Sequence, residues 1–285
     1  MTNDPIVLVL CGGDGTRLGR FAEWRHKCLL PIDDGEPVFA RHVRAFPGRW
    51  RTYANVPARW EHAYAAHKRA LELKRLTLIP IPSPPRGSGA TLSILARDNP
   101  GRDVFVCYGD TRLDRAWYDA ALAQLAETTW VGAEPVQSGD PARAGGLLRV
   151  RDRVIDRVIE HPRGPRDAAR VTHWHAGIQH YSARDAAKVA RMRGRDLDVM
   201  GDVMPRIVAV GAVRVVTANG QGTHGIEDVG TVSRYAEHCL WTQLARSGVR
   251  YRLGPDAVEA ARAVIEAHRI FTAGNGGPSS NTFTL

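Results

Sequence analysis

The 285 residues are 44% hydrophobic, which is enough to bury one large core, or one core and an appendage. The formal net charge of +9 comes mostly from arginines spread along the chain, and no basic stretch alternates with aromatic residues, so nucleic-acid binding is disfavoured. No apolar run reaches the length of a membrane span, no basic segment precedes the first short apolar run, and the four cysteines form no CxxC pair. We therefore expect a cytoplasmic protein without a membrane partner, disulfides or a zinc site.

Strands and helices alternate along the first half of the chain. Residues 6–10 form a continuous apolar run, which is typical of a parallel strand covered on both faces. Further buried strands are expected over residues 76–81, 104–108 and 130–133, and helices over residues 38–45, 57–74 and 114–126. This order predicts an α/β fold with a Rossmann-like, mostly parallel sheet flanked by helices.

From about Gly145 the pattern changes to strands separated by short polar turns. These strands are expected over residues 147–150, 154–159 and 171–181, which predicts a mixed sheet in the second half. A helix over 198–210, a strand over 213–217 and helices over 231–245 and 255–268 complete the pattern. We expect one main domain over residues 1–253, followed by a C-terminal helix and a Gly/Ser tail over residues 254–285.

The first strand runs directly into the glycine-rich segment GGDGTRL, residues 12–18. Glycines let successive backbone N–H groups converge on phosphate oxygens, and Arg17 adds a cationic fork that suits a polyphosphate. Lys27 follows in HKCLLPI. The pattern is neither a P-loop nor the dinucleotide fingerprint GxGxxG. The alternative is a tight strand-to-helix turn with a solvated arginine and lysine.

Together, GGDGTRL and HKCLLPI resemble the GGxGTRL…PKPLLPI signature of the sugar-1-phosphate nucleotidyltransferases, which include glucose-1-phosphate thymidylyl- and uridylyltransferases and mannose- and heptose-1-phosphate guanylyltransferases. The spacing of arginine and lysine is longer than we expect of the related molybdopterin and isoprenoid-precursor enzymes. The resemblance implies the nucleotide-diphospho-sugar transferase fold, with Lys27 and Arg17 as catalytic residues. The implied triphosphate ligands are Gly12, Gly13, Gly15, Thr16 and Arg17. The family's proline before the lysine is His26 here, a change that we do not expect to affect the chemistry.

Two aspartates are candidate metal ligands. Asp110 follows the strand over 104–108, at the end of a strand where open α/β sheets bind ligands, and Asp228 lies far downstream. Either residue alone could be a helix cap. Their segments, YGD and DVGT, resemble family motifs that carry metal-binding aspartates. Because Mg²⁺ prefers hard oxygen ligands, usually one or two carboxylates with substrate phosphates, the resemblance implies Mg²⁺ as the cofactor.

The sugar-phosphate side matches the family more loosely. Gly146 leads a strand that resembles the one touching the sugar, Glu160 and His161 stand at the family's EKP, and His175 and Gly177 lie in its NAGIY segment. The family's lysine is His161 here and its asparagine is His175, so the second cation is titratable and the sugar contacts are altered. The alternative is that both histidines, and Glu160, are residues without a role.

Two further segments bear on the substrates. RGSGA, with Gly87 and Ser88, resembles the stretch under the nucleobase and is closer to guanylyltransferases. The segment 257–285 resembles the opening of a sedoheptulose 7-phosphate isomerase domain, which suggests a fused or partner isomerase. It is far too short for a domain of typical size, so no isomerase activity is expected from this chain.

These resemblances favour GTP and a heptose 1-phosphate as substrates, with pyrophosphate as the second product. The alternative is a hexose 1-phosphate with UTP or dTTP. Some proteins of this fold are non-catalytic regulatory subunits, but the intact GGDGTRL, Lys27 and both aspartates argue against that role. Family members are often dimers or tetramers, so the resemblance also allows a homo-oligomer.

Overall fold

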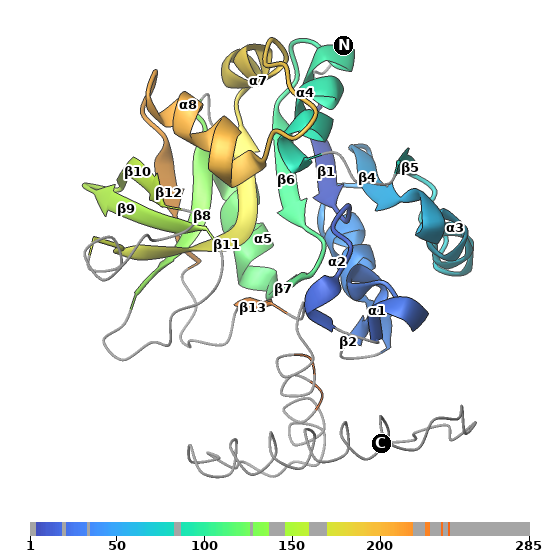
Figure 1. The fold of residues 1–285 in the computed structure, drawn as a ribbon. Coiled ribbons are helices and arrows are strands. Elements are labelled where there is room, and N and C mark those ends of the chain that lie inside the picture. The colour runs from blue at the N-terminus through green and yellow to red at the C-terminus, as the bar shows by residue number, and fades with distance from the viewer. Residues whose placement is uncertain are drawn as a thin grey trace, which may run out of the picture.

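The computed structural model describes residues 4–18, 21–32, 35–82, 87–125, 128–136, 146–159, 170–218 and 226–228, together with residues 235 and 239. Within these residues one nine-stranded sheet has the order β5-β4-β1-β6-β11-β8-β12-β10-β9 (Figure 1). Its strands are β1 Ile6–Leu10, β4 Arg51–Pro57, β5 Leu76–Ile81, β6 Val104–Tyr108, β8 Trp130–Pro135, β9 Leu147–Arg151, β10 Val154–Ile159, β11 His173–Tyr181 and β12 Arg214–Val216. Two small sheets pair β2 (Pro31–Ile32) with β3 (Glu36–Pro37), and β7 (Thr111–Leu113) with β13 (Ile226–Asp228).

The sheet is parallel in its first half and mixed in its second, as the sequence predicts. β5, β4, β1 and β6 run parallel to one another, while β11 lies antiparallel to both β6 and β8. β12 is parallel to β8, and β10 and β9 complete the sheet in antiparallel pairings. The central strand β1 lies between β4 and β6 and is buried along its whole length, which explains its continuous apolar run.

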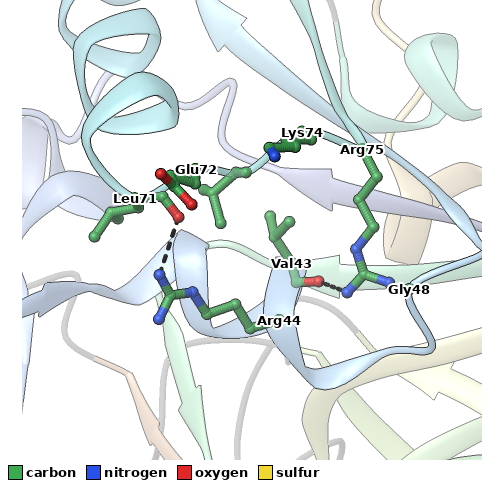
Figure 2. A pocket seen from close by; sticks show the side chains of 8 residues that line it. Val43, Arg44, Gly48, Leu71, Glu72, Lys74 and Arg75 are labelled. Carbon is green, nitrogen blue, oxygen red and sulfur yellow. Dashed lines mark hydrogen bonds between the residues drawn. The ribbon is translucent and has the colours of Figure 1, made fainter.

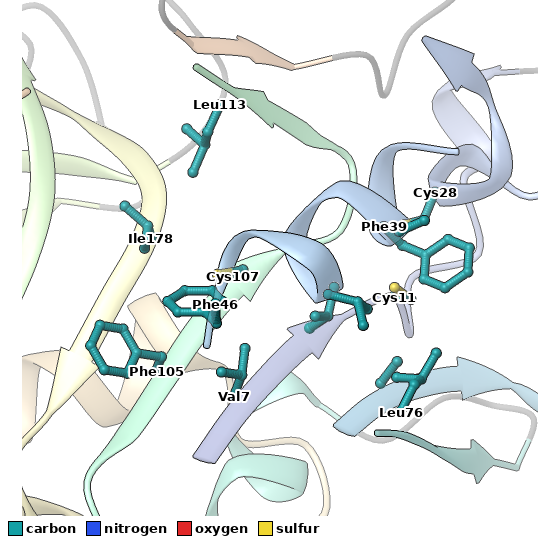
Figure 3. Packing of buried hydrophobic residues seen from close by; sticks show 14 of the residues in the cluster. Val7, Cys11, Cys28, Phe39, Phe46, Leu76, Phe105, Cys107, Leu113 and Ile178 are labelled. Atoms are coloured by element: carbon teal, nitrogen blue, oxygen red, sulfur yellow. The ribbon is translucent and has the colours of Figure 1, made fainter. Parts of the chain in front are cut away.

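Helices cover both faces of the sheet. Val7 and Val9 of β1 belong to the core cluster that includes residues of α2 (Val38–Ala45), α3 (Glu61–Ala70) and α5 (Arg115–Ala123) (Figure 3). Ile6 and Leu8 point to the other cluster, which is formed with α4 (Ser88–Asp98), α7 (Ala183–Val189) and α8 (Met204–Val208). Successive side chains of a strand point to opposite faces, so β1 anchors both layers. No helix in the described part of the chain is long and apolar enough to cross a membrane.

Most expected elements are present, and the differences have physical reasons. The bounds of β1, β5, β6, β10 and α2 agree with the sequence prediction. The helix expected over 57–74 is shorter, because 51–57 is β4 and 58–60 a 3₁₀ turn before α3. The helix expected over 198–210 begins as a π turn (Val199–Val203) and continues as α8. The helices expected over 231–245 and 255–268, and the tail over 254–285, lie outside the described residues.

Candidate active site

The glycine-rich loop and Asp110 follow two neighbouring parallel strands, β1 and β6, so both lie at the carboxyl ends of these strands. β1 and β6 are in register from Ile6 opposite Val104 to Leu10 opposite Tyr108, and the N–H of Gly109 donates to the carbonyl of Leu10 at 2.9 Å. The loop turns at Gly15, whose φ is +70°, into a 3₁₀ helix over Thr16–Leu18. The backbone of Arg17 lies in this turn, and its side chain is outside the described part of the structure.

Lys27 links the loop to Asp110. Its Nζ lies 2.5 Å from Oδ2 of Asp110, with side chains that are only 15% and 9% exposed. The same Nζ lies 3.4 Å from the point where a Cβ on Gly13 would be. The structure therefore places the ammonium of Lys27 between the backbone of the loop and a carboxylate, although the three residues come from separate segments.

Asp228 is brought to the same place by backbone pairing. β13 runs antiparallel to β7, with Asp228 opposite Thr111, the residue that follows Asp110. Neighbouring strands lie about 4.8 Å apart, so the backbones of the two aspartates are neighbours across this small sheet. The side chain of Asp228 is outside the described residues. This pairing is the structural counterpart of the two motifs that suggested a metal.

The donor chemistry of this pair fits Mg²⁺. Carboxylates are hard oxygen ligands, and Mg²⁺ proteins usually supply one or two of them and leave the other positions to phosphates and water. Among the described residues no group of three or more His, Cys, Asp or Glu side chains could hold a metal. The nearby thiol of Cys28 is an unsuitable ligand, because burial raises its pKa well above the usual value and keeps it neutral.

The turn before Asp110 must be glycine for steric reasons. A Cβ on Gly109 would lie 2.5 Å from Sγ of Cys11 and 3.1 Å from Sγ of Cys28. Both cysteines are fully buried beneath the loop, in the same core cluster (Figure 3). A larger residue at position 109 would therefore displace either the start of the loop or the aspartate that follows.

On the other side of Asp110, strand β11 carries His175 and Gly177. The ring of His175 packs edge-on against Tyr108 with centroids 5.1 Å apart. The backbone N–H of His175 donates to the carbonyl of Gly146 at 2.9 Å. Burial lowers the pKa of His175 to about 4, so this side chain is neutral at neutral pH. Gly177 has a φ of +80° and lies directly against the side chain of Thr111.

Gln179 also lies on β11, beside His175, and the sequence analysis did not identify it. Its amide nitrogen lies 3.1 Å from Nε2 of His175 and 3.2 Å from Sδ of Met200, and its amide oxygen accepts from the hydroxyl of Tyr181 at 2.8 Å. A thioether only accepts, so the amide nitrogen faces Met200 and donates to Nε2 of His175. This chain of hydrogen bonds places the proton of the neutral His175 ring on Nδ1.

Gly87 and Ser88 are engaged by another part of the chain. The N–H of Gly87 donates to the carbonyl of Arg195 at 3.0 Å, and the hydroxyl of Ser88 donates to Asp198 at 2.7 Å and accepts from the N–H of Val199 at 2.9 Å. They hold the segment before α8 against the start of α4. Their expected contact with the nucleobase stays a prediction, and so do the roles of Glu160 and His161, which lie outside the described residues.

A separate cavity of about 240 Å³ is lined by residues that precede β4 and β5, so it lies near the amino ends of these strands. Figure 2 shows its lining side chains. Two arginines line it, and both bind backbone carbonyls. Arg75 donates to the carbonyls of Val43 and Pro47, and Arg44 donates to the carbonyl of Leu71 at 3.0 Å. These cations tie the end of α2 to the start of β5, so we assign this cavity a structural role.

The family model of the MobA-like NTP transferase domain matches residues 7–200, which include the glycine-rich loop, Lys27 and Asp110. The chain belongs to this family. No curated protein sequence matches this NTP transferase. The matched segment ends before Asp228, so the family match does not include this residue, and its role as a metal ligand stays a prediction.

Solved structures of similar fold include transferases that act on phosphorylated substrates. A Bacillus anthracis protein assigned as a glucose-1-phosphate thymidylyltransferase, in complex with a sucrose, has a TM-score of 0.66 and 16% identity over 87% of this chain and 97% of its own. An inositol-1-phosphate CTP transferase from T. maritima has a TM-score of 0.65 and 12% identity over 93% and 96%. HddC from Yersinia pseudotuberculosis, complexed with GMP-PN, has a TM-score of 0.61 and 17% identity over 84% and 98%. These similarities establish the nucleotide-diphospho-sugar transferase fold.

Proposed function

We propose that this NTP transferase joins a nucleoside triphosphate to a sugar 1-phosphate and releases pyrophosphate. The observation that carries the proposal is the position of Lys27, whose ammonium lies between Asp110 and the backbone of Gly13. A cation beside a carboxylate and a glycine-rich loop suits a reaction in which two polyanions meet. The three similar structures, two of which are named for transfer to phosphorylated substrates, support the same reaction class.

In the proposed reaction an oxygen of the sugar 1-phosphate attacks the α-phosphorus in line, as the bond between the α-phosphorus and the bridging oxygen breaks. The attacking phosphate is already ionised, so no general base is needed. The loop N–H groups (residues 12–16) and Arg17 would bind the triphosphate and stabilise the leaving pyrophosphate. Lys27 would offset negative charge where the two phosphates meet. Mg²⁺, held by Asp110 and Asp228, would neutralise phosphate oxygens and orient them.

On the acceptor side, His175 is proposed to contact the sugar as a neutral hydrogen-bonding group. A neutral ring suits a hydroxyl better than a phosphate dianion, so the cation for the sugar phosphate is expected at His161. Glu160 is proposed to accept from sugar hydroxyls, and the backbones of Gly146 and Gly177 to line the same space. Gly87 and Ser88 would lie under the nucleobase.

We further propose GTP and a heptose 1-phosphate as the substrates. The RGSGA segment and the similarity to HddC complexed with GMP-PN support a guanine nucleotide. The isomerase-like segment over 257–285 supports the heptose 1-phosphate. The second candidate is a hexose 1-phosphate with UTP or dTTP, which the similarity to the glucose-1-phosphate thymidylyltransferase favours. A homo-oligomer and a fused or partner isomerase belong to the same proposal, and light scattering and co-purification test them.

The deciding experiment is a pyrophosphate-release screen. GTP, ATP, UTP, CTP and dTTP are each combined with D-glycero-D-manno-heptose 1-phosphate, glucose 1-phosphate and mannose 1-phosphate, with Mg²⁺ or with EDTA. We expect the highest kcat/KM with GTP and the heptose phosphate. A much higher kcat/KM with a hexose phosphate would refute the heptose assignment. Absence of turnover with every pair would refute the proposed enzymatic activity and would favour a regulatory subunit of the same fold.

A further inference from the structure

His26 occupies a buried position between the glycine-rich loop and helix α3. The residue is 1% exposed, directly precedes Lys27 and makes two short hydrogen bonds through its ring. Nε2 lies 2.6 Å from the carbonyl oxygen of Gly13, and Nδ1 lies 2.6 Å from the hydroxyl of Tyr64 on α3. Tyr64 is itself fully buried in the core. One side chain therefore connects an exposed loop residue to the rigid interior of the protein.

The partners determine how the ring is protonated in its neutral form. The carbonyl of Gly13 can only accept, so Nε2 must carry the hydrogen. Nδ1 then accepts the hydrogen bond that the Tyr64 hydroxyl donates. Both bonds are satisfied without a net charge, which is favourable in a buried position. The geometry is thus a complete bridge from α3 through His26 to the loop.

Other contacts hold the loop on either side of Gly13, and Arg59 donates to the carbonyl of Asp14 at 3.2 Å and lies 3.5 Å from its carboxylate. Cys11, which starts it, is fixed because its N–H donates to Oδ1 of Asn55 at 2.7 Å. Gly13 itself is exposed, and its neighbour Gly12 packs against Asn55 and Ile81. His26 is the side chain that holds the carbonyl of Gly13, and it lies next to Lys27 in sequence. A shift of His26 would therefore move both the loop backbone and the Lys27 ammonium.

We propose that His26 is a positioning residue that fixes the glycine-rich loop in the conformation that receives the triphosphate. This proposal rests on the proposed function for its catalytic meaning, although the hydrogen-bonded bridge itself does not depend on it. It also revises the expectation that replacing the family's proline by histidine leaves the chemistry unaffected. Proline has no side-chain donor and could not make the bond to Gly13.

Two conservative variants separate the two hydrogen bonds. In His26→Gln the amide nitrogen can take the place of Nε2 and keep the bond to the Gly13 carbonyl. In His26→Asn the shorter amide can replace only Nδ1, so the bond to Tyr64 is kept and the bond to Gly13 is lost. His26→Leu fills space without any donor and is expected to behave like the asparagine variant. Tyr64→Phe removes only the hydrogen bond to α3 and keeps the one to Gly13, so it shows how far the order of the loop depends on the anchor in the core.

The first measurement is amide hydrogen exchange without ligand, which needs no activity. The N–H of Leu18 donates to the carbonyl of Gly15 at 2.9 Å and reports on the loop, while the N–H of Cys11 is the buried reference. We expect the exchange rate of the Leu18 amide to be about threefold to tenfold higher in His26→Asn and His26→Leu than in His26→Gln, which is the effect of losing one hydrogen bond. The exchange rate of the Cys11 amide should be the same in all three variants. Equal exchange at Leu18 in all variants would overturn the proposal.

The second measurement is steady-state kinetics. A looser loop must be ordered on binding, so the KM for the nucleotide should rise about threefold to tenfold in His26→Asn, with the KM for the sugar phosphate unchanged. A general loss of stability would not separate the two KM values. A parallel rise of both KM values, or equal values in the Gln and Asn variants, would overturn the proposal. If the wild-type protein turns over no substrate pair, the proposed function fails while the exchange comparison still decides the role of His26.

Discussion

Gly177 offers a direct test of how β11 supports the proposed metal-binding side of the site. Gly177 has a φ of +80°, and a Cβ at this position would lie 2.9 Å from both Cβ and Cγ2 of Thr111 and 3.0 Å from its Oγ1. Thr111 follows Asp110 and pairs with Asp228, so a displacement here reaches both aspartates. The variant Gly177→Ala adds one methyl group at this contact.

The expected cost has two parts. A non-glycine residue in the left-handed region costs about 1–2 kcal/mol. The steric overlap with Thr111 adds the cost of overpacking a buried site, about 1–3 kcal/mol. Gly177→Ala should therefore lower the free energy of unfolding by about 2–5 kcal/mol, which for a domain of this size corresponds to roughly 2–4 °C in Tm per kcal/mol. The concentration of Mg²⁺ needed for half-maximal activity should also rise.

Urea unfolding of Gly177→Ala, Thr111→Ala and the double variant measures the two parts separately. Thr111→Ala removes Cγ2 and Oγ1 but keeps Cβ, which would still lie 2.9 Å from the new methyl group, so the double variant should recover part of the steric cost and none of the backbone cost. The coupling free energy of this cycle reports the contact itself. A loss below about 0.5 kcal/mol in Gly177→Ala, which is typical of surface substitutions, would refute the reasoning. A double variant that is no more stable than Gly177→Ala would refute the steric part alone.

Four further outcomes are expected. Lys27→Ala should lower kcat about a hundredfold or more with the fold intact, since the ammonium acts on transition-state charge, and near-normal turnover would remove it from the mechanism. Asp110→Asn and Asp228→Asn should each weaken the response of activity to Mg²⁺, and a crystal with nucleotide that shows the ion away from both would refute the assignment. Arg75→Met should lower the unfolding free energy by about 1–3 kcal/mol in a denaturant titration, because two carbonyls at the end of α2 lose a charged donor, and should leave kcat unchanged. Burial lowers the pKa of His42 from 6.5 to about 4, so between these pH values the unfolded chain binds a proton that the folded chain does not. The free energy of unfolding should therefore fall as the pH is lowered from 6.5 to about 4. If urea unfolding of His42→Phe shows the same dependence on pH as the wild type, His42 is not its origin.

The elements that the sequence predicts well are those with one dominant signal. β1 is a pure apolar run, and α2 places Phe39 and Val43 on one face at helical spacing, so both are found with the right bounds. β4 was missed because buried polar residues, Thr52 and Asn55, interrupt its pattern. α4 was missed because most of its surface is buried, between the sheet and neighbouring segments, which removes the polar face that identifies a helix.

The candidate site divides in the same way. The loop, Lys27 and Asp110 lie in short motifs whose chemistry is local, and the structure brings all three together. The hydrogen bonds of His26 and Gln179 depend on the fold. His26 contacts Tyr64, which is distant in sequence, and Gln179 contacts His175 because both side chains lie on the same part of β11. A single polar residue in an apolar strand gives no periodic signal of what it faces. Such contacts depend on tertiary packing and are defined only in the folded protein.

The late position of β13 has a consequence for the order in which the protein acquires its properties during synthesis. Every strand of the nine-stranded sheet has been made once Val216 has been added, whereas Asp228 follows in a separate two-stranded pairing. A chain that stops between these two residues would contain the complete sheet and Lys27 with Asp110, yet it would lack the second carboxylate. Ribosome-bound or C-terminally shortened chains should therefore become compact before they become responsive to Mg²⁺. Under the proposed function, a response to Mg²⁺ would report synthesis beyond Asp228 in a way that compactness does not.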